Sequence, residues 1–229
     1  MYHSHIYGKK RKKEGMDMWG VDSAAKVTET LLTCVRQQYG FPQFWGRYVT
    51  TVPNVSDGLT KEEIAFIRGR GIKIAPIYNA FREATQYEKG RTAARNAIFH
   101  ARRLGIPKNK VIFANIEDEF DVDAAWIRAW VDTFYPSGYR PGIYANPTKG
   151  AFGEAYCEAV KNDERVAQQT MIWSSYPRPG TTSATKAPTF RPNVPNCRAN
   201  VWMWQYGRDA DRCAIDTNVA NRKISDYLY

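Results

Sequence analysis

Short apolar segments alternate with amphipathic segments from residue 18 onward. The first apolar segment, Met18–Asp22 (MWGVD), has the length of a β-strand. After it, apolar residues recur at helical spacing from Ala24 to Val35, and Gly40 ends the segment. The same order of strand and helix then repeats, so the chain up to Ala159 predicts five strand–helix pairs.

The five predicted strands differ in character but share their order relative to the helices. They are Met18–Asp22, Phe44–Thr50, Ile72–Asn79, Val111–Glu117 and Arg140–Asn146, and the predicted helices lie within residues 24–35, 60–71, 94–104, 122–134 and 152–159. Thr60 and Glu63 have the spacing of a capping box at the start of the second helix. Val111–Glu117 is almost continuously apolar, which is typical of a strand buried on both faces.

The alternation ends after the fifth helix. Thr170–Tyr176 and Val201–Tyr206 are further predicted strands, and Ala214–Val219 is the last. Between the first two, Pro177–Asn200 holds five of the twelve prolines and four bases without an acid, which predicts a long irregular loop. A short amphipathic end, Lys223–Tyr229, follows the last strand.

This order predicts an α/β fold, a TIM-like barrel of the (β/α)5β3 type. Alternating strands and helices demand a parallel sheet, and eight strands suffice to close it. Only seven residues link Tyr206 to Ala214, and a parallel crossover usually needs about a dozen. The last strand is therefore expected to run antiparallel to its predecessor, with its first residues at the rim where the other strands end.

The first residues carry much of the excess charge. The chain has 33 Lys+Arg against 23 Asp+Glu, and five bases lie within Lys9–Lys13. Glu14 and Gly15 follow instead of an apolar stretch, so this is not a secretory signal. Residues 1–16 are interpreted as a basic disordered leader, a cloning remnant or a segment upstream of the true start; nucleic-acid binding and an import signal stay open. Residues 17–229 are expected to form one domain.

Composition excludes several other classes of protein. With 43% hydrophobic and 24% charged residues, the chain can build a core, and no apolar run approaches the roughly 18 residues of a membrane span. Only three histidines are present, which argues against a histidine-rich metal site. We expect no metal and no cofactor. No cysteine pair has CxxC spacing; Cys34 and Cys157 fall on predicted helices, where buried thiols are common. A disulfide between Cys197 and Cys213 is not expected, because they lie near opposite ends of one strand.

The candidate chemistry lies at the carboxyl ends of the strands, where barrels of this type place their active sites. Alternation puts Asn115 and Glu117 on one face of their strand and Ile116 on the other. The acids Asp22, Glu117 and Asp216 share the predicted rim, and separated carboxylates suit glycoside hydrolysis. The aromatic, amide and basic residues predicted around them are Arg47, Tyr48, Tyr78, Asn79, Asn115, Tyr144, Asn146, Trp173, Trp204 and Gln205.

The motifs at these strand ends resemble a known family. GVD at residues 20–22, NIE at 115–117, IYAN at 143–146, and WQY followed by IDTN at 215–218 are similar to those of glycoside hydrolase family 25, the lysozyme-like N-acetylmuramidases. A closer resemblance is to the glycoside-hydrolase-like bacterial family first catalogued as domain of unknown function 1906. It extends from Met18 to about Ala220.

The resemblance implies roles for four residues. Glu117 matches the general acid, and Asp22 and Asp216 match the aspartates of the first and eighth strands. Asn115 stands where the muramidases usually carry an aspartate, which is a departure from the family pattern. Asn115 could still hold an acetamido group that itself attacks the anomeric carbon, or it could mark a site that binds without cutting.

Three hypotheses about function follow. The first is a cell-wall-directed glycosidase that cleaves peptidoglycan or a related anionic wall polysaccharide, with Glu117 as general acid, acting as a monomer at the bacterial cell wall or spore. The second is a non-catalytic carbohydrate-binding barrel, motivated by Asn115. The third is a binder of nucleic acid or anionic surfaces through Lys9–Lys13; it ranks last, because the predicted barrel has no phosphate-binding loop and no specific nucleic-acid partner is expected.

Overall fold

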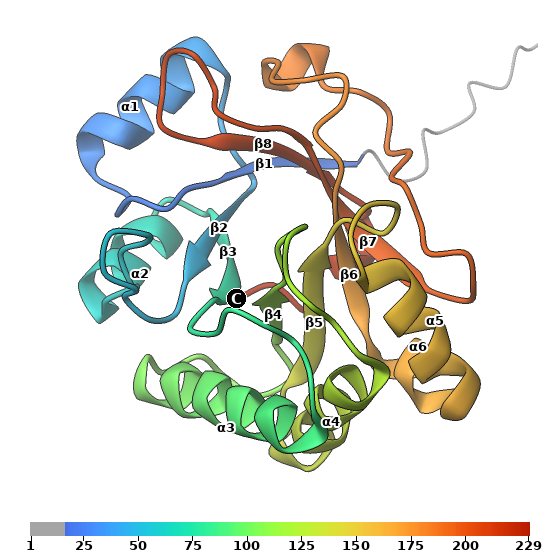
Figure 1. Cartoon of the computed structure of the whole chain (residues 1–229). Coiled ribbons are helices and arrows are strands. Elements are labelled where there is room, and N and C mark those ends of the chain that lie inside the picture. Colours follow the sequence, from blue (N-terminus) through green and yellow to red (C-terminus); the bar gives the residue numbers. More distant parts are fainter. Residues whose placement is uncertain (1–16) are drawn as a thin grey trace, which may run out of the picture.

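The computed structural model describes residues 17–229, which form a closed eight-stranded barrel with helices on its outside (Figure 1). The interpretations of residues 1–16 lie outside the described residues. The strands are β1 (Met18–Asp22), β2 (Phe44–Tyr48), β3 (Lys73–Tyr78), β4 (Val111–Asn115), β5 (Arg140–Ala145), β6 (Met171–Ser175), β7 (Asn200–Gly207) and β8 (Asp216–Ala220). The α-helices are α1 (Glu29–Gln38), α2 (Lys61–Arg68), α3 (Tyr87–Arg103), α4 (Ala124–Phe134), α5 (Phe152–Asn162) and α6 (Arg165–Gln169), with 3-10 turns η1 (Tyr135–Ser137), η2 (Ala184–Lys186) and η3 (Arg222–Ile224).

The strand order confirms the predicted (β/α)5β3 barrel. Strands β1 to β7 pair in sequence order and run parallel. Strand β8 runs antiparallel to both β7 and β1, and it closes the barrel between them. In Figure 1, β8 in red lies beside β1 in blue, although the two strands are at opposite ends of the chain. This closure places Asp22 directly opposite Asp216.

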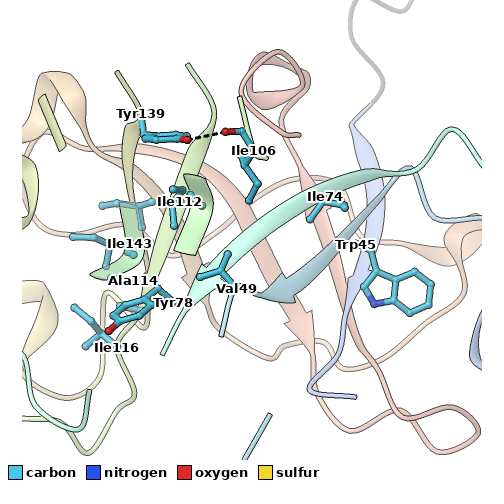
Figure 2. Packing of buried hydrophobic residues seen from close by; sticks show 14 of the residues in the cluster. Trp45, Val49, Ile74, Tyr78, Ile106, Ile112, Ala114, Ile116, Tyr139 and Ile143 are labelled. Carbon is cyan, nitrogen blue, oxygen red and sulfur yellow. Dashed lines mark hydrogen bonds between the residues drawn. The ribbon is translucent and has the colours of Figure 1, made fainter. Parts of the chain in front are cut away.

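The two faces of the strands enter two separate apolar clusters. Side chains that point into the barrel, such as Phe44, Phe113 and Met203, pack with Ile224 and Leu228 from the segment after β8. Side chains of the other face pack against the helices; Figure 2 shows part of this outer cluster, including Ile74. Successive strand residues alternate between these faces. A residue's place along its strand therefore decides whether its side chain points into the barrel or toward the helices.

Gly46 shows how tightly the barrel is filled just below the mouth. A Cβ atom at this position would lie 2.6 Å from the Asp22 Cβ atom and 2.6 Å from the Trp173 ring. Only glycine leaves room for both side chains on the inner face of β2. The small residue therefore allows a large indole to support the polar groups above it.

One helix start and one capping box differ from the sequence prediction. Helix α1 begins at Glu29, because the Thr28 hydroxyl caps it by accepting a hydrogen bond from the Leu31 amide, so residues 24–27 form a loop. Thr60 caps α2 as predicted, by accepting a hydrogen bond from the Glu63 amide. The Glu63 side chain does not complete the capping box; it turns inward to bond Arg47 and the Val27 amide.

The carboxy-terminal half agrees with the prediction in outline and differs in detail. Residues 177–199 form an irregular loop whose only regular element is η2. Strand β8 begins at Asp216, two residues later than predicted, and a short extra helix, α6, precedes β6. No helix within residues 17–229 is long and apolar enough to cross a membrane.

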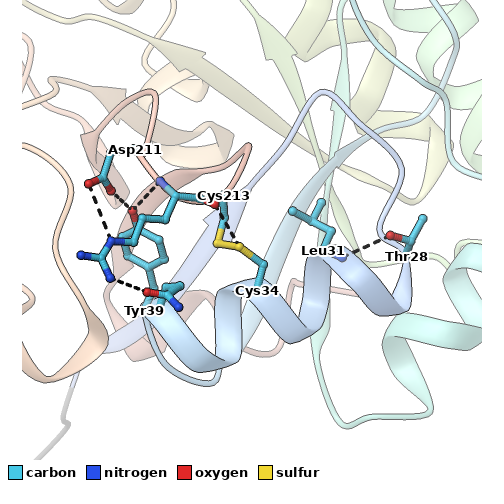
Figure 3. Close-up of a disulfide and its surroundings, with 8 residues drawn as sticks. Thr28, Leu31, Cys34, Tyr39, Asp211 and Cys213 are labelled. Carbon is cyan, nitrogen blue, oxygen red and sulfur yellow. Dashed lines mark hydrogen bonds and ion pairs between the residues drawn. A yellow bond between two sulfur atoms is a disulfide. The ribbon is translucent and has the colours of Figure 1, made fainter.

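The expectation of buried thiols is wrong, because all four cysteines form disulfides. Cys34 on α1 pairs with Cys213 in the loop before β8 (Figure 3), and Cys157 on α5 pairs with Cys197 in the long loop. Cys197 and Cys213 are not bonded to each other, as expected. Each bond joins a helix to a loop of the carboxy-terminal part, and this proximity comes from barrel closure, which the spacing of the cysteines does not indicate.

Candidate functional site

The polar side chains of the barrel mouth come from strands that are far apart in the sequence. Asp22 ends β1 and Asp216 begins β8, and the antiparallel pairing of these strands brings both to the same rim. Gln205, near the end of β7, reaches between them: its Nε2 atom donates to Asp22 Oδ2 at 3.1 Å and to Asp216 Oδ2 at 3.0 Å. One amide group therefore joins the two carboxylates.

A second amide orients Asp22. Asn218 Nδ2 donates to Asp22 Oδ2 at 2.6 Å, and Asn218 Oδ1 accepts from Trp173 Nε1 at 2.9 Å. Trp173 is fully buried in the barrel interior, so its indole N–H decides which way the Asn218 amide faces. Trp173 thus acts below the mouth as a support, not as an exposed sugar-stacking surface.

Burial changes the protonation of both aspartates. Burial raises the pKa of Asp22, against the hydrogen bonds from Asn218 and Gln205, which lower it. Burial and the neighbouring Asp22 carboxylate raise the pKa of Asp216 to about 8. Together the two groups therefore hold a proton near neutral pH, and the pair behaves as one coupled acid.

Glu117 lies just beyond β4 with its side chain half-buried at the mouth. Asn115 Nδ2 donates to Glu117 Oε1 at 2.8 Å, so the two residues share one face of the chain. Ile116 between them packs into the outer cluster. The amide of Asn115 therefore holds one carboxylate oxygen of Glu117, and the other oxygen faces Arg208, whose Nη2 atom lies 3.9 Å away.

Arg208, one residue beyond β7, connects the two parts of the mouth. Its Nε atom donates to Gln205 Oε1 at 2.9 Å, and its Nη2 atom donates to Tyr144 Oη at 2.9 Å and to Ser175 Oγ at 2.6 Å. The guanidinium group thus spans β5, β6 and β7 and reaches toward Glu117. It is the only cation that bonds these groups within residues 17–229.

Sequence reasoning missed Arg208, Asn218 and Ser175. Arg208 and Ser175 lie at strand ends, but neither belongs to a motif of the resemblance. Asn218 lies within the IDTN motif and two residues after Asp216, so alternation alone places it on the same face. The alternation rule, applied to β8, is the signal that could have found it.

Two tyrosines of the predicted set point into the mouth. Tyr144 Oη donates to Gln205 Oε1 at 2.8 Å and receives the hydrogen bond from Arg208. Burial raises the pKa of Tyr144, and burial with the Asp22, Glu117 and Asp216 carboxylates raises the pKa of Tyr48. Both phenols therefore stay protonated over the whole physiological range and can donate hydrogen bonds.

Three predicted site residues lie on the outer face of the barrel wall. The guanidinium group of Arg47 is fully buried against Glu63, with Arg47 Nε 2.7 Å from Glu63 Oε1. Tyr78 packs toward the helices beside His100, and Trp204 donates its indole N–H to the Tyr176 carbonyl. All three follow the alternation of their strands, which turns them away from the carboxylates.

The two remaining predicted amides make local contacts in loops at the rim. Asn79 Nδ2 donates to the Ser56 hydroxyl at 2.9 Å, and its Oδ1 atom is buried without a partner among residues 17–229. Asn146 Oδ1 accepts from the Thr148 amide and hydroxyl groups. Neither amide bonds a carboxylate of the mouth.

A cavity of about 380 Å³ opens over the two aspartates. Its wall comes from the loop after β1 and the loop before β8, and Glu117 does not line it. The lining residues are Asp22, Ser23, Ala24, Ala25, Asp209, Ala210, Ala214, Ile215 and Asp216. Within residues 17–229, no three His, Cys, Asp or Glu side chains are grouped so as to hold a metal ion.

The fold of this barrel is glycoside-hydrolase-like, and the sequence gives the family. Residues 41–225 match the family described as "Rv2525c-like, glycoside hydrolase-like domain". The chain belongs to this family. No sequence among curated proteins matches the chain.

Solved structures share the fold. An uncharacterised B. stearothermophilus protein is 64% identical, with a TM-score of 0.92 over 93% of this chain and 100% of that one. A family GH25 lysozyme from Aspergillus fumigatus is 14% identical, with a TM-score of 0.54 over 90% of this chain and 94% of that one. The autolysin LytC from Streptococcus pneumoniae, solved with a synthetic peptidoglycan ligand, is 11% identical, with a TM-score of 0.55 over 89% of this chain and 46% of that one.

Proposed function

We propose that the chain is a glycoside hydrolase that cleaves glycosidic bonds of bacterial peptidoglycan, with Glu117 as general acid. The observation that carries the proposal is the group of three carboxylates, Asp22, Glu117 and Asp216, around one barrel mouth, with a cavity of about 380 Å³ beside the two aspartates. Glycoside hydrolysis needs an acid for the leaving oxygen and a negative group for the developing cation. The fold shared with a lysozyme and with a peptidoglycan-bound autolysin supports the choice of polymer.

The contacts suggest a different role for each of the three acids. Glu117 is half-buried at the mouth, where it can reach the oxygen of a bound glycan. Asp22 receives hydrogen bonds from two amides and is held in one orientation, which suits a group that stabilises positive charge at the sugar ring. The Asp22 carboxylate raises the pKa of Asp216, so a proton on Asp216 limits the negative charge of the pair.

Asn115 takes a role that does not need a negative charge. Its Nδ2 atom holds Glu117, and its Oδ1 atom remains an acceptor for the N–H group of a substrate acetamido substituent. An acetamido group positioned in this way can attack the anomeric carbon in place of an enzyme carboxylate, a recognised variant of glycoside hydrolysis. The proposal therefore accommodates an amide at this position.

Release of reducing ends from purified peptidoglycan tests the proposal. We expect release by the parent chain and none by Glu117→Gln, with mass spectrometry of the fragments showing which sugar carries the new end. Glu119→Gln is the matched control, because Glu119 is an exposed acid of the adjacent turn and the variant should retain full activity. Retained turnover in Glu117→Gln would remove Glu117 from the mechanism.

A binding barrel without hydrolysis is the second candidate. The observation in its favour is that Asn115 and Arg208 face the two oxygens of Glu117 and can hold this side chain as a ligand contact. In that case neither the parent nor Glu117→Gln releases reducing ends, while both still sediment with cell walls. The same assay therefore distinguishes the two candidates.

A further inference from the structure

Helix α3 carries a row of arginines along the side that faces the end of α4 and η1. Arg91, Arg95 and Arg102 are four and seven residues apart, a spacing that puts them on one face of the helix together with Ile98. At 1.5 Å per residue the row is about 16 Å long. A ligand that engages all three groups must therefore be extended.

The row borders a groove of about 550 Å³ between α3 and the end of α4 with η1. Helices α3 and α4 pack side by side on the outside of the barrel (Figure 1). The buried side chain of Ile98 forms part of the floor, and Phe99, with 61% of its surface exposed, forms part of a wall with Pro136. The groove thus offers apolar and aromatic surface beneath a line of positive charge.

Two of the three guanidinium groups have no ion pair. Arg91 pairs with Glu88 at 2.8 Å, whereas Arg95 and Arg102 are exposed and have no salt bridge within residues 17–229. The acid on the opposite wall, Asp132, accepts a hydrogen bond from the Tyr87 hydroxyl and faces Arg128 at 3.5 Å. The positive charge of Arg95 and Arg102 is therefore not balanced by the groove itself.

The groove is separate from the barrel mouth. Its lining residues all come from α3, the end of α4 and η1, and none of them bonds Asp22, Glu117, Asp216 or Arg208. Helix α3 follows β3 and returns along the outside of the barrel, so its first turn lies toward the rim and its last turn toward the opposite end. A polymer in the groove would leave the mouth open.

We propose that this groove binds a polymer with regularly spaced phosphodiester groups, of the polyol-phosphate kind. A row of arginines fits repeated phosphates, because each guanidinium fork can bond two phosphate oxygens. The length of the row excludes a single small anion as the ligand of all three groups. The apolar floor and Phe99 suit the carbon chain or sugar between phosphates, which an entirely charged surface would not contact.

Binding of poly(ribitol phosphate) to the full chain tests the proposal. The variant Arg95→Ala/Arg102→Ala should bind at least about tenfold more weakly, and the slope of log K against log salt should fall by about 2, one for each lost phosphate contact. The control Arg222→Ala/Lys223→Ala removes the same charge from an exposed turn outside the groove and should bind as the parent does. An equal loss of affinity in both variants would show that only the net charge matters, and it would overturn the proposal.

The shape of the guanidinium group provides a second test. Arg95→Lys/Arg102→Lys keeps the charge but loses the fork, so we expect an affinity between those of the parent and the double alanine variant. In the parent, bound polymer should protect Arg95 and Arg102, but not Arg222, from modification by phenylglyoxal. Absence of this protection would contradict the proposal even if Lys9–Lys13 contributed to the affinity.

Two competing ligands test the specificity of the groove for polyol phosphates. Chitin oligomers lack charge and should not compete with poly(ribitol phosphate). Duplex DNA has regular phosphates but a wide, stiff outline, and it should compete weakly; stronger protection of Arg95 and Arg102 by DNA than by the polymer would replace the proposal with a nucleic-acid site. Hydrolysis of soluble glycan fragments should be equal in the parent and in Arg95→Ala/Arg102→Ala, so this test is independent of the proposed activity.

Discussion

Two arginine–glutamate pairs in this barrel have opposite surroundings. Arg47 and Glu63 lie between the barrel wall and α2, where both side chains are 0% exposed and their N···O distance is 2.7 Å. Arg208 and Glu117 lie at the mouth, where the side chains are 35% and 33% exposed and the distance is 3.9 Å. The first pair is closed and dry, and the second is open to solvent and ligand.

The hydrogen bonds explain the difference. Besides Glu63, the Arg47 guanidinium bonds three backbone carbonyl oxygens, so the pair fastens loops to the barrel wall. The Arg208 guanidinium bonds side chains only, and those side chains belong to the carboxylate network of the mouth. An ion pair that holds backbone is part of the scaffold, whereas one that holds side chains around an opening can change its partners when a ligand arrives.

The largest expected effect is on the closed pair. Arg47→Met leaves the Glu63 carboxylate buried without its partner, so the free energy of unfolding should fall by about 3–5 kcal/mol. Urea unfolding measures this change. In Arg47→Met/Glu63→Leu, where no charge remains buried, at least half of the loss should be recovered; a double variant as unstable as the single one would show that the carbonyl contacts dominate.

Loss of either disulfide should have the next largest effect. Replacing both cysteines of either bond by serine should lower the free energy of unfolding by about 2–4 kcal/mol. The bond between Cys34 and Cys213 spans 179 residues, whereas the bond between Cys157 and Cys197 spans 40. Loss of the Cys34–Cys213 bond should therefore cost about 1 kcal/mol more. Only the loss of Cys34–Cys213 should also reduce hydrolysis, because Cys213 anchors the loop that begins with Arg208. Equal activity in the two variants would show that the position of this loop does not affect hydrolysis.

The open pair should affect activity more than stability. Arg208→Met removes charge-assisted hydrogen bonds around the carboxylates, so kcat/KM for glycan hydrolysis should fall by about 10- to 100-fold. The free energy of unfolding should change by less than about 2 kcal/mol, because the partners remain within reach of water. Thermal unfolding measures the stability change, and reducing-end kinetics of the same preparation measure the change in kcat/KM. A stability loss as large as that of Arg47→Met would abolish the contrast between the pairs.

The smallest expected effect is the pH dependence of the mouth. The pKa of Asp216 is raised to about 8 in the folded chain, so the folded state binds a proton that the unfolded state releases above about pH 4. The stability that this proton contributes is complete at low pH and is lost as the pH rises from about 4 to 8. The stability of Asp216→Asn relative to the parent should therefore increase as the pH rises from about 4 to 8 and should level off above that range. A constant difference between parent and variant over this range would refute the raised pKa.

Alternation along the strands explains which site residues the sequence could predict. The two-residue spacing of Asn115 and Glu117 predicts that they share one face, and the hydrogen bond between their side chains agrees with that prediction. The position of Arg47, Tyr78 and Trp204 at strand ends places them near the rim but does not say which face each one occupies. Gly46 and Tyr48 on the inner face already imply that Arg47 points outward.

The alternation rule cannot predict contacts between segments that are distant in the sequence. Cys34 meets Cys213 only because β8 closes the barrel beside β1, and Arg208 meets Glu117 only because β4 and β7 end at the same rim. Sequence separation gives no distance across a closed barrel. The pairing of cysteines and the network around Arg208 therefore required the structure.

The sequence by itself determined the order of strands and helices, the closed barrel and the antiparallel last strand, because local periodicity and loop length control these features. It also indicated that Asp22, at the end of β1, and Asp216, at the start of β8, share one rim. The tertiary structure decided which side chains touch: the Gln205 bridge between Asp22 and Asp216, the two kinds of arginine pair and the groove beside α3. These contacts depend on side-chain direction and barrel closure, which bring together residues whose separation in the chain carries no distance information.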